Sequence, residues 1–170
     1  KFRVLKSAEV NILKDGSLDI ADSTLKTLDL VCCAVHSNFG MTEAAITERI
    51  IRAMKNPFMN ILFHPTGRLV GKRPACQIDI LKVLRAAKQY GVAMEANAQP
   101  ERLDLRDAAI RDAVRMGVKL VVDSDAHAPQ HFQYLNLGVA QVRRGWGEMS
   151  DVLNTKSVND FLISLRKLKK

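Results

Sequence analysis

The stretch VVDSDAHAPQH (residues 121–131) joins an apolar run directly to a cluster of ionisable side chains. The run begins upstream in VKLVVDS (residues 118–124), which has the length and composition of a buried strand. Asp123, Asp125 and His127 follow, and a proline ends the extended segment. Since ionisable groups cost free energy when they are buried without partners, this stretch predicts a site where something compensates their charge.

The rest of the chain shows the same alternation of apolar strands and amphipathic helices. Further strands are predicted at residues 8–13, 28–37, 59–65 and 91–98. Helices are predicted after Asp22 as a cap, at 42–56 with Thr42 as cap, at 77–90, at 105–116 with Asp104 as cap, and from Ser157 onward, where Phe161, Leu162, Leu165 and Leu168 share one side. Pro57, Gly91 and Gly117 are typical helix ends. Five strands separated mostly by helices predict an α/β fold with right-handed crossovers and a parallel sheet, either open or closed into a barrel.

Length and composition indicate one globular domain of 170 residues, 47% of them apolar. No apolar run approaches the roughly 18 to 20 residues of a membrane span, and the N-terminus lacks the core of a signal peptide. We therefore expect a cytoplasmic protein with no membrane partner, whose three cysteines are core thiols. The net charge of +8, with a basic tail at residues 166–170, suits either a polyanion such as nucleic acid or an ordinary solvated surface.

Three of the four histidines, His36, His64 and His127, follow the carboxyl ends of predicted strands. Ligands and catalytic groups gather at that edge in parallel α/β folds. A single histidine there is more often a hydrogen-bonded structural residue, but three in equivalent positions favour a common site. Asp125 and His127 are two residues apart, so both point to one side of an extended segment. Imidazole and carboxylate together favour zinc, manganese or iron.

Two neighbouring residues are less clear. Asp123 faces the same side as Asp125 by parity, although a capping or helix-facing role suits it equally well. His131 lies beyond Pro129 in a predicted helix start and is not assigned to the site.

Several segments resemble a known family. AEVNIL, AVHS, FHPTGR, MEANAQPERLDL, SDAH, RRGW and DVLNT, in this order from about Glu9 to Thr155, are similar to the polymerase-and-histidinol-phosphatase (PHP) domain at the C-terminus of bacterial and archaeal family X DNA polymerases. The resemblance implies a distorted βα barrel, a metal site at its carboxyl edge, and a 3′-5′ exonuclease or related phosphoesterase activity in DNA repair.

The resemblance also implies roles for individual residues. Glu9 would be a bridging carboxylate, His36 and His64 imidazole ligands, and Asp125 and His127 the last ligand pair, for two or three zinc or manganese ions in the intact domain. Glu95 and Asn97 match a recurring stretch of the family but receive no ligand role.

The family site also uses an HxH-type motif and further ligands that would precede Lys1. We therefore expect residues 1–170 to be the C-terminal part of a single PHP domain, an incomplete barrel that binds metal incompletely and hydrolyses DNA weakly or not at all. Exposed sheet edges in such a piece would favour a homodimer.

DNA and a polymerase domain of the same chain are the partners that the resemblance implies. Arg68 could reach a phosphate, and Arg143 and Arg144 beside Trp146 could contact a single strand, unless they serve surface salt bridges and packing. Two other functions stay open: a phosphatase of the histidinol-phosphatase type acting on small esters, and a non-catalytic module that positions DNA.

Overall fold

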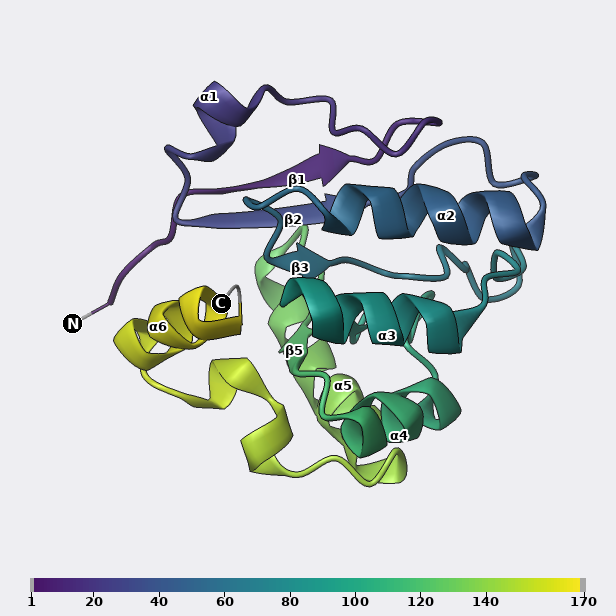
Figure 1. Ribbon diagram of the computed structural model, residues 1–170. Helices are drawn as coiled ribbons and strands as arrows, with labels where there is room; N and C mark the ends of the chain where they lie inside the picture. Colours follow the sequence, from purple (N-terminus) through teal and green to yellow (C-terminus); the bar gives the residue numbers. More distant parts are fainter. Residues whose placement is uncertain (1, 169–170) are drawn as a thin grey trace.

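The computed structural model describes residues 2–168 and contains one five-stranded parallel sheet (Figure 1). Its strands are β1 (Ser7–Asn11), β2 (Leu30–Ala34), β3 (Ile61–Leu62), β4 (Ala93–Asn97) and β5 (Leu120–Asp123). They lie in the order β1-β2-β3-β4-β5, so neighbours in the sheet are also neighbours along the chain. The predicted α/β class is confirmed, while closure into a barrel stays a prediction.

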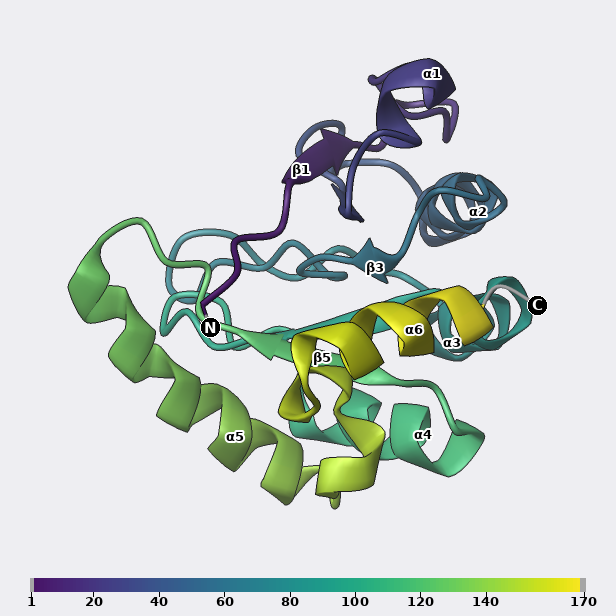
Figure 2. The ribbon, with the colours of Figure 1, turned by 90° about the vertical axis from the view of Figure 1, so that its left-hand side faces the viewer.

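The connecting helices are α1 (Asp22–Leu25), α2 (Glu43–Met54), α3 (Ile80–Tyr90) and α4 (Asp107–Met116), followed by α5 (Leu135–Arg144) and α6 (Val158–Leu168). Short 3₁₀ turns η1 (Pro129–Tyr134), η2 (Met149–Asp151) and η3 (Leu153–Thr155) join the later elements. Because each right-handed crossover moves one strand further in the same direction, α2, α3 and α4 lie side by side on one face (Figures 1 and 2).

The larger core lies between the sheet and these helices. Val10, Cys33, Leu62, Met94 and Val122 point to it from the five strands. Ile50, Leu84 and Ile110, all fully buried, meet them from α2, α3 and α4. This apolar layer fixes the strands in register and so determines which side chains appear on the opposite face.

The opposite face of the sheet is divided along the strands. Cys32, Ile61 and Ala93 are direct cross-strand neighbours and are buried by side chains of η3 and α6, among them Leu153, Phe161, Leu162 and Leu165. Figure 1 shows α6 at the left, apart from α2, α3 and α4. By alternation, the same face carries polar residues further toward the carboxyl ends: Asn11, Glu95, Asn97 and Asp123. The polar part of this face is where the candidate site lies.

Several predicted helix ends are confirmed, whereas the strands predicted at 28–37, 59–65 and 91–98 are shorter than expected. Thr42 accepts from the backbone N–H of Ala45 at 3.3 Å, and Gly91 and Gly117 end their helices with φ of 64° and 69°. The final helix begins beside Ser157, whose hydroxyl accepts from the N–H of Asp160 at 3.2 Å.

Two predicted caps are wrong. Asp104 is buried and accepts from the N–H and hydroxyl of Thr66, both at 2.9 Å, so α4 begins only after Arg106. Asp22 is the first residue of α1 rather than its cap. Both acidic residues occur in a sequence pattern typical of a helix start. The contact with Thr66 decides the position of Asp104, whereas Asp22 differs from its predicted position by one residue.

Two further boundaries differ from the prediction. The helix predicted from residue 77 begins at Ile80, because Asp79 accepts from the N–H of Lys82 at 2.9 Å. The helix start predicted near Pro129 is a 3₁₀ turn, η1, which begins at Pro129 and leads directly into α5 at Leu135. The pattern of α5 is weakened by Gly138, where a Cβ atom would lie 2.7 Å from Val122 and 2.8 Å from Ala98.

The remaining expectations concern the surface and the ends. Cys32 and Cys33 are buried and Cys76 is half-buried, as expected for core thiols. No helix within residues 2–168 is long and apolar enough to span a membrane. Lys169 and Lys170 of the basic tail lie outside the described residues.

Candidate metal centre

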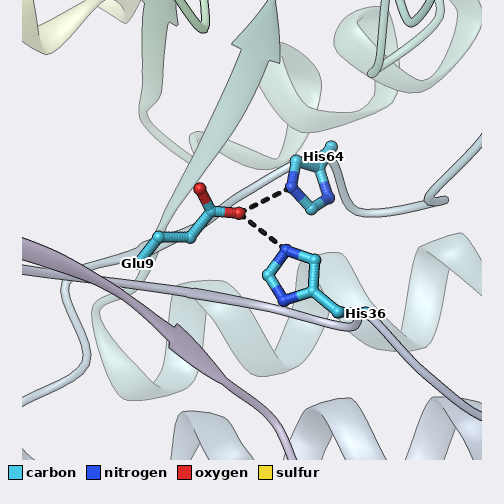
Figure 3. A group of neighbouring side chains, drawn as sticks. All are labelled: Glu9, His36 and His64. Carbon is cyan, nitrogen blue, oxygen red and sulfur yellow. Dashed lines mark hydrogen bonds and ion pairs between the residues drawn. The ribbon is translucent and has the colours of Figure 1, made fainter. Parts of the chain in front are cut away.

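Three residues from successive strands meet at the carboxyl side of the sheet. Glu9 lies in the middle of β1, while His36 and His64 each lie two residues beyond the ends of β2 and β3. Because β1, β2 and β3 are adjacent and parallel, the three side chains converge although they are up to 55 residues apart in sequence. Figure 3 shows both imidazole rings directed at one carboxylate oxygen.

The geometry of this centre is compact. Glu9 Oε1 lies 2.8 Å from His36 Nε2 and 2.8 Å from His64 Nε2. The donor atoms of the three residues all lie within 4.8 Å of one another. These hydrogen bonds, from His36 first and His64 second, hold the pKa of Glu9 well below its usual range against the opposing effect of burial. Glu9 is therefore ionised wherever the fold persists.

The orientation of His36 is fixed from its other side. Its Nδ1 lies 2.6 Å from Oδ1 of Asn11, whose amide nitrogen in turn donates to Asp19 at 2.5 Å. Since an amide oxygen only accepts, Nδ1 donates to Asn11, and this contact fixes the ring so that Nε2 faces Glu9. An imidazole oriented by such a partner is typical of metal sites.

His64 is held by its backbone. Its side chain is only 3% exposed, and its backbone N–H donates to the carboxylate of Glu95. The φ angle of His64 is 27°, in a region that few non-glycine residues adopt, and the turn is closed by the N–H of Gly67 donating to its carbonyl at 2.8 Å. Nδ1 of His64 is buried and has no hydrogen-bond partner within residues 2–168.

Near His64 lies a pair of carboxyl groups, the buried Glu95 and the partly buried Asp123. Burial and the neighbouring Asp123 raise the pKa of Glu95 well above its usual value. Burial also raises the pKa of Asp123, to about 6. Glu95 therefore binds its proton more tightly than an exposed carboxyl group does. The sequence prediction assigned neither residue, although both lie on the polar face by strand alternation.

Asp125 and His127 form a separate pair. Asp125 has φ of 47° and accepts from Nε of Arg102 at 3.2 Å and from Nδ2 of Asn97 at 3.4 Å. Nδ1 of His127 lies 2.8 Å from the carbonyl oxygen of Asp125, and its side chain is 73% exposed. Asn97 also donates to Glu95 at 3.2 Å, so a hydrogen-bonded chain connects Asp125 with the residue that holds His64. The ligand roles of Asp125 and His127 stay predictions.

The residues predicted to bind DNA lie in different environments. Arg68 is half-buried and donates to the carbonyl oxygens of Arg102 and Leu103. Arg144 donates to Asp107 at 3.0 Å, and Arg143 lines an apolar cavity beside α5. Trp146 is 64% exposed and lies near the guanidinium groups of α4 rather than those of α5. Their contact with DNA stays a prediction.

The donor set of Glu9, His36 and His64 fits a transition-metal ion. Two imidazole nitrogens and a carboxylate oxygen converge on one point, which suits zinc, manganese or iron better than magnesium or calcium. Three ligands leave open positions for further donors and for substrate. Fold and centre together define a parallel α/β protein with a candidate metal centre of carboxylate and imidazole groups at the carboxyl edge of its sheet.

Comparison with known proteins identifies the family. The chain is 40% identical over 166 residues to the DNA polymerase/3′-5′ exonuclease PolX of Bacillus subtilis, an alignment that covers 98% of this chain and 29% of that protein. It is 37% identical over 134 residues to a probable phosphatase of Thermoanaerobacter, covering 73% of this chain and 52% of that protein. A probable phosphatase of Acetivibrio thermocellus is 32% identical over 134 residues, covering 74% of this chain and 53% of that protein.

No model of a described protein family matches the chain. The chain spans about half the length of these phosphatases and less than a third of the polymerase. The similarity to the polymerase nevertheless extends over almost every residue, and the phosphatases share most of the same region. The chain belongs to the polymerase-and-histidinol-phosphatase family, as its motifs predicted.

Proposed function

We propose that this chain carries part of a metal-dependent phosphoesterase centre that acts on the phosphodiesters of DNA, as a 3′-5′ exonuclease in DNA repair. The observation that supports this most directly is the convergence of Glu9, His36 and His64, with both Nε2 atoms 2.8 Å from one carboxylate oxygen. The similarity to a DNA polymerase/3′-5′ exonuclease over 98% of the chain supports DNA as the substrate.

In this proposal each residue has a defined task. His36 and His64 would hold metal through their imidazoles together with the Glu9 carboxylate, and Asp125 and His127 would complete the ligand set. When bound, zinc or manganese would lower the pKa of a water and offset charge on the phosphate oxygens. Asn11 orients the ring of His36, and Glu95 fixes the backbone of His64. Ligand histidines must be neutral, so activity should fall in acid.

The proposal extends to the whole protein. Five ligands are fewer than two or three ions need, at about four to six bonds each. We therefore propose that residues 1–170 are the C-terminal part of a PHP domain, with low activity alone. A polymerase domain in the same protein and a cytoplasmic location belong to the same proposal.

Metal binding tests the centre directly. Equilibrium dialysis of the purified chain against zinc or manganese should show binding that Glu9→Gln weakens at least roughly tenfold, because the bridging carboxylate is lost. Glu43→Gln, which changes the charge of an exposed residue at the start of α2, is the matched control and should bind metal as the natural chain does. Equal binding by Glu9→Gln would refute the centre.

A second candidate function is hydrolysis of a small phosphate ester, which the probable phosphatases among the relatives favour. Assays of the longer protein on single-stranded DNA and on a phosphomonoester, with metal present, distinguish the two. Preferential release of nucleotides from DNA supports the exonuclease, and preferential monoester cleavage supports the phosphatase. Metal binding with neither activity would leave a DNA-positioning module.

A further inference from the structure

A basic cavity of about 460 Å³ lies among the residues that follow β3 and β4. Its lining includes Arg68, Lys72, Arg73 and Arg106, and no acidic residue contributes to it. Both segments follow the carboxyl ends of their strands, so the cavity lies on the same side of the sheet as Glu9, His36 and His64.

The positive charge of this cavity is only partly compensated. Lys72 pairs with Glu101 at 2.9 Å. In contrast, Arg68, Arg73 and Arg106 form no ion pair with a carboxylate within residues 2–168. Burial first, and then the nearby charge of Arg106, lower the pKa of Arg68 against the opposing effects of Asp104 and Asp107. Repulsion between guanidinium groups is a cost that an anion in the cavity would relieve.

Two of the arginines are held in place by neutral contacts. Nε and Nη2 of Arg68 each lie 2.5 Å from a backbone carbonyl oxygen. Arg73 donates through Nε to the carbonyl of Gly67 at 2.8 Å, and its guanidinium lies 3.9 Å from the centre of the Phe39 ring. A guanidinium has five N–H donors, so both side chains retain donors while losing little entropy on binding an anion.

The cavity is close to the metal centre along the chain. Arg68 follows His64 by four residues, beyond the turn that Gly67 closes. Four residues of extended chain span at most about 15 Å. A few nucleotides of a single strand span a similar distance. A small phosphate monoester carries a single phosphate, so it would not occupy the metal centre and the cavity at once.

We propose that this cavity binds non-scissile phosphates of a DNA strand whose terminal phosphodiester lies at the Glu9, His36 and His64 centre. This inference rests on the proposed function and deepens it, since it gives the chain a means of preferring a polynucleotide to a small ester. Arg106 is the residue to test, because it is exposed and its side chain forms no hydrogen bond within residues 2–168.

The experiment measures binding of a fluorescent single-stranded oligothymidylate of about ten nucleotides by anisotropy, without metal, over a range of salt concentrations. Arg106→Gln is expected to weaken binding about fivefold near 0.1 M salt and to reduce the slope of log K against log salt by about 0.7, the loss of one ionic contact to a single strand. Arg85→Gln, the same charge change on the exposed side of α3, should bind as the natural chain does.

Three results would overturn the proposal. They are unchanged binding and salt slope in Arg106→Gln, equal binding of an uncharged methylphosphonate oligomer, and competition by thymidine monophosphate at the same concentration as by the oligomer. Because the assay contains no metal, failure to hydrolyse DNA bears only on the proposed function, and unchanged binding by Arg106→Gln bears only on the cavity.

Discussion

Buried ionisable residues support the candidate centre from one side. His64 reaches Glu9 because its backbone is held by Glu95, and burial beside Asp123 raises the pKa of Glu95 well above its usual value. Such polar networks are costly unless every member has a partner. A bound cation would not contact the buried Nδ1 of His64. It would bind the opposite nitrogen, Nε2, and so fix the orientation of the ring.

Replacing Asp123 with asparagine should change how stability depends on pH. Its pKa rises from 3.8 to about 6 on folding, so the folded state binds its proton more tightly than the unfolded chain does. That contribution is fully present in acid and is lost as pH rises from about 4 to about 6, a change of roughly 3 kcal/mol at most. The asparagine of the Asp123→Asn variant does not titrate. As pH rises through this range, the free energy of unfolding of the variant should therefore increase relative to that of the natural chain by up to that amount.

Urea unfolding at several pH values, with a chelator present, measures this difference. If the curves of the variant and the natural chain run parallel from about pH 4 to about pH 7, the buried titration of Asp123 is refuted.

At the scale of elements, helix α6 gives the sheet its second apolar face. Leu165 is 2% exposed, and with Phe161 and Leu162 it covers Cys32, Ile61 and Ala93. The amphipathic pattern of this helix was predicted from the sequence. The face that it covers was not, because the pattern shows only that one side is buried and not against what.

Leu165→Ala should reduce the free energy of unfolding by about 2 to 5 kcal/mol, since it leaves a cavity on this face. Ile163→Ala on the same helix is the matched control, because Ile163 is 45% exposed and its truncation should cost well under half as much. Denaturant unfolding of both variants checks the prediction. Equal losses would mean that α6 does not pack as described.

At the scale of the whole molecule, the two edge strands are unequal. The backbone of Val122 in β5 exchanges hydrogen bonds with the side chain of Asn154, at 2.6 and 3.1 Å, and Leu120 forms a parallel bridge with Val152. The β5 edge is therefore covered. On β1, Asp19 accepts from the N–H of Asn11 at 3.0 Å and blocks only the end of the strand.

The predicted homodimer would therefore form through β1 rather than β5. Light scattering at rising protein concentration should show self-association, since unpaired N–H and C=O groups of an edge strand can pair with a second copy. A strict monomer over the whole range would contradict this prediction.

The sequence by itself determined the elements and the edge on which the site lies. Alternation of apolar runs, the Thr42 cap and the glycines after two helices act over a few residues, so they can be read locally. The extent of helix α5 was not predicted, because a glycine within a helix is unfavourable. Gly138 is required there by its close contact with Val122 and Ala98.

Only the tertiary structure decided which ionisable groups meet. Glu9 and His64 are 55 residues apart, and their contact depends on the register of three strands, which the distant apolar core fixes. The same register buries Glu95 beside Asp123, and the loops bring Arg68 and Arg106 to one cavity. Local patterns place each residue along its own element, whereas packing between elements sets the distances on which metal binding and charge depend.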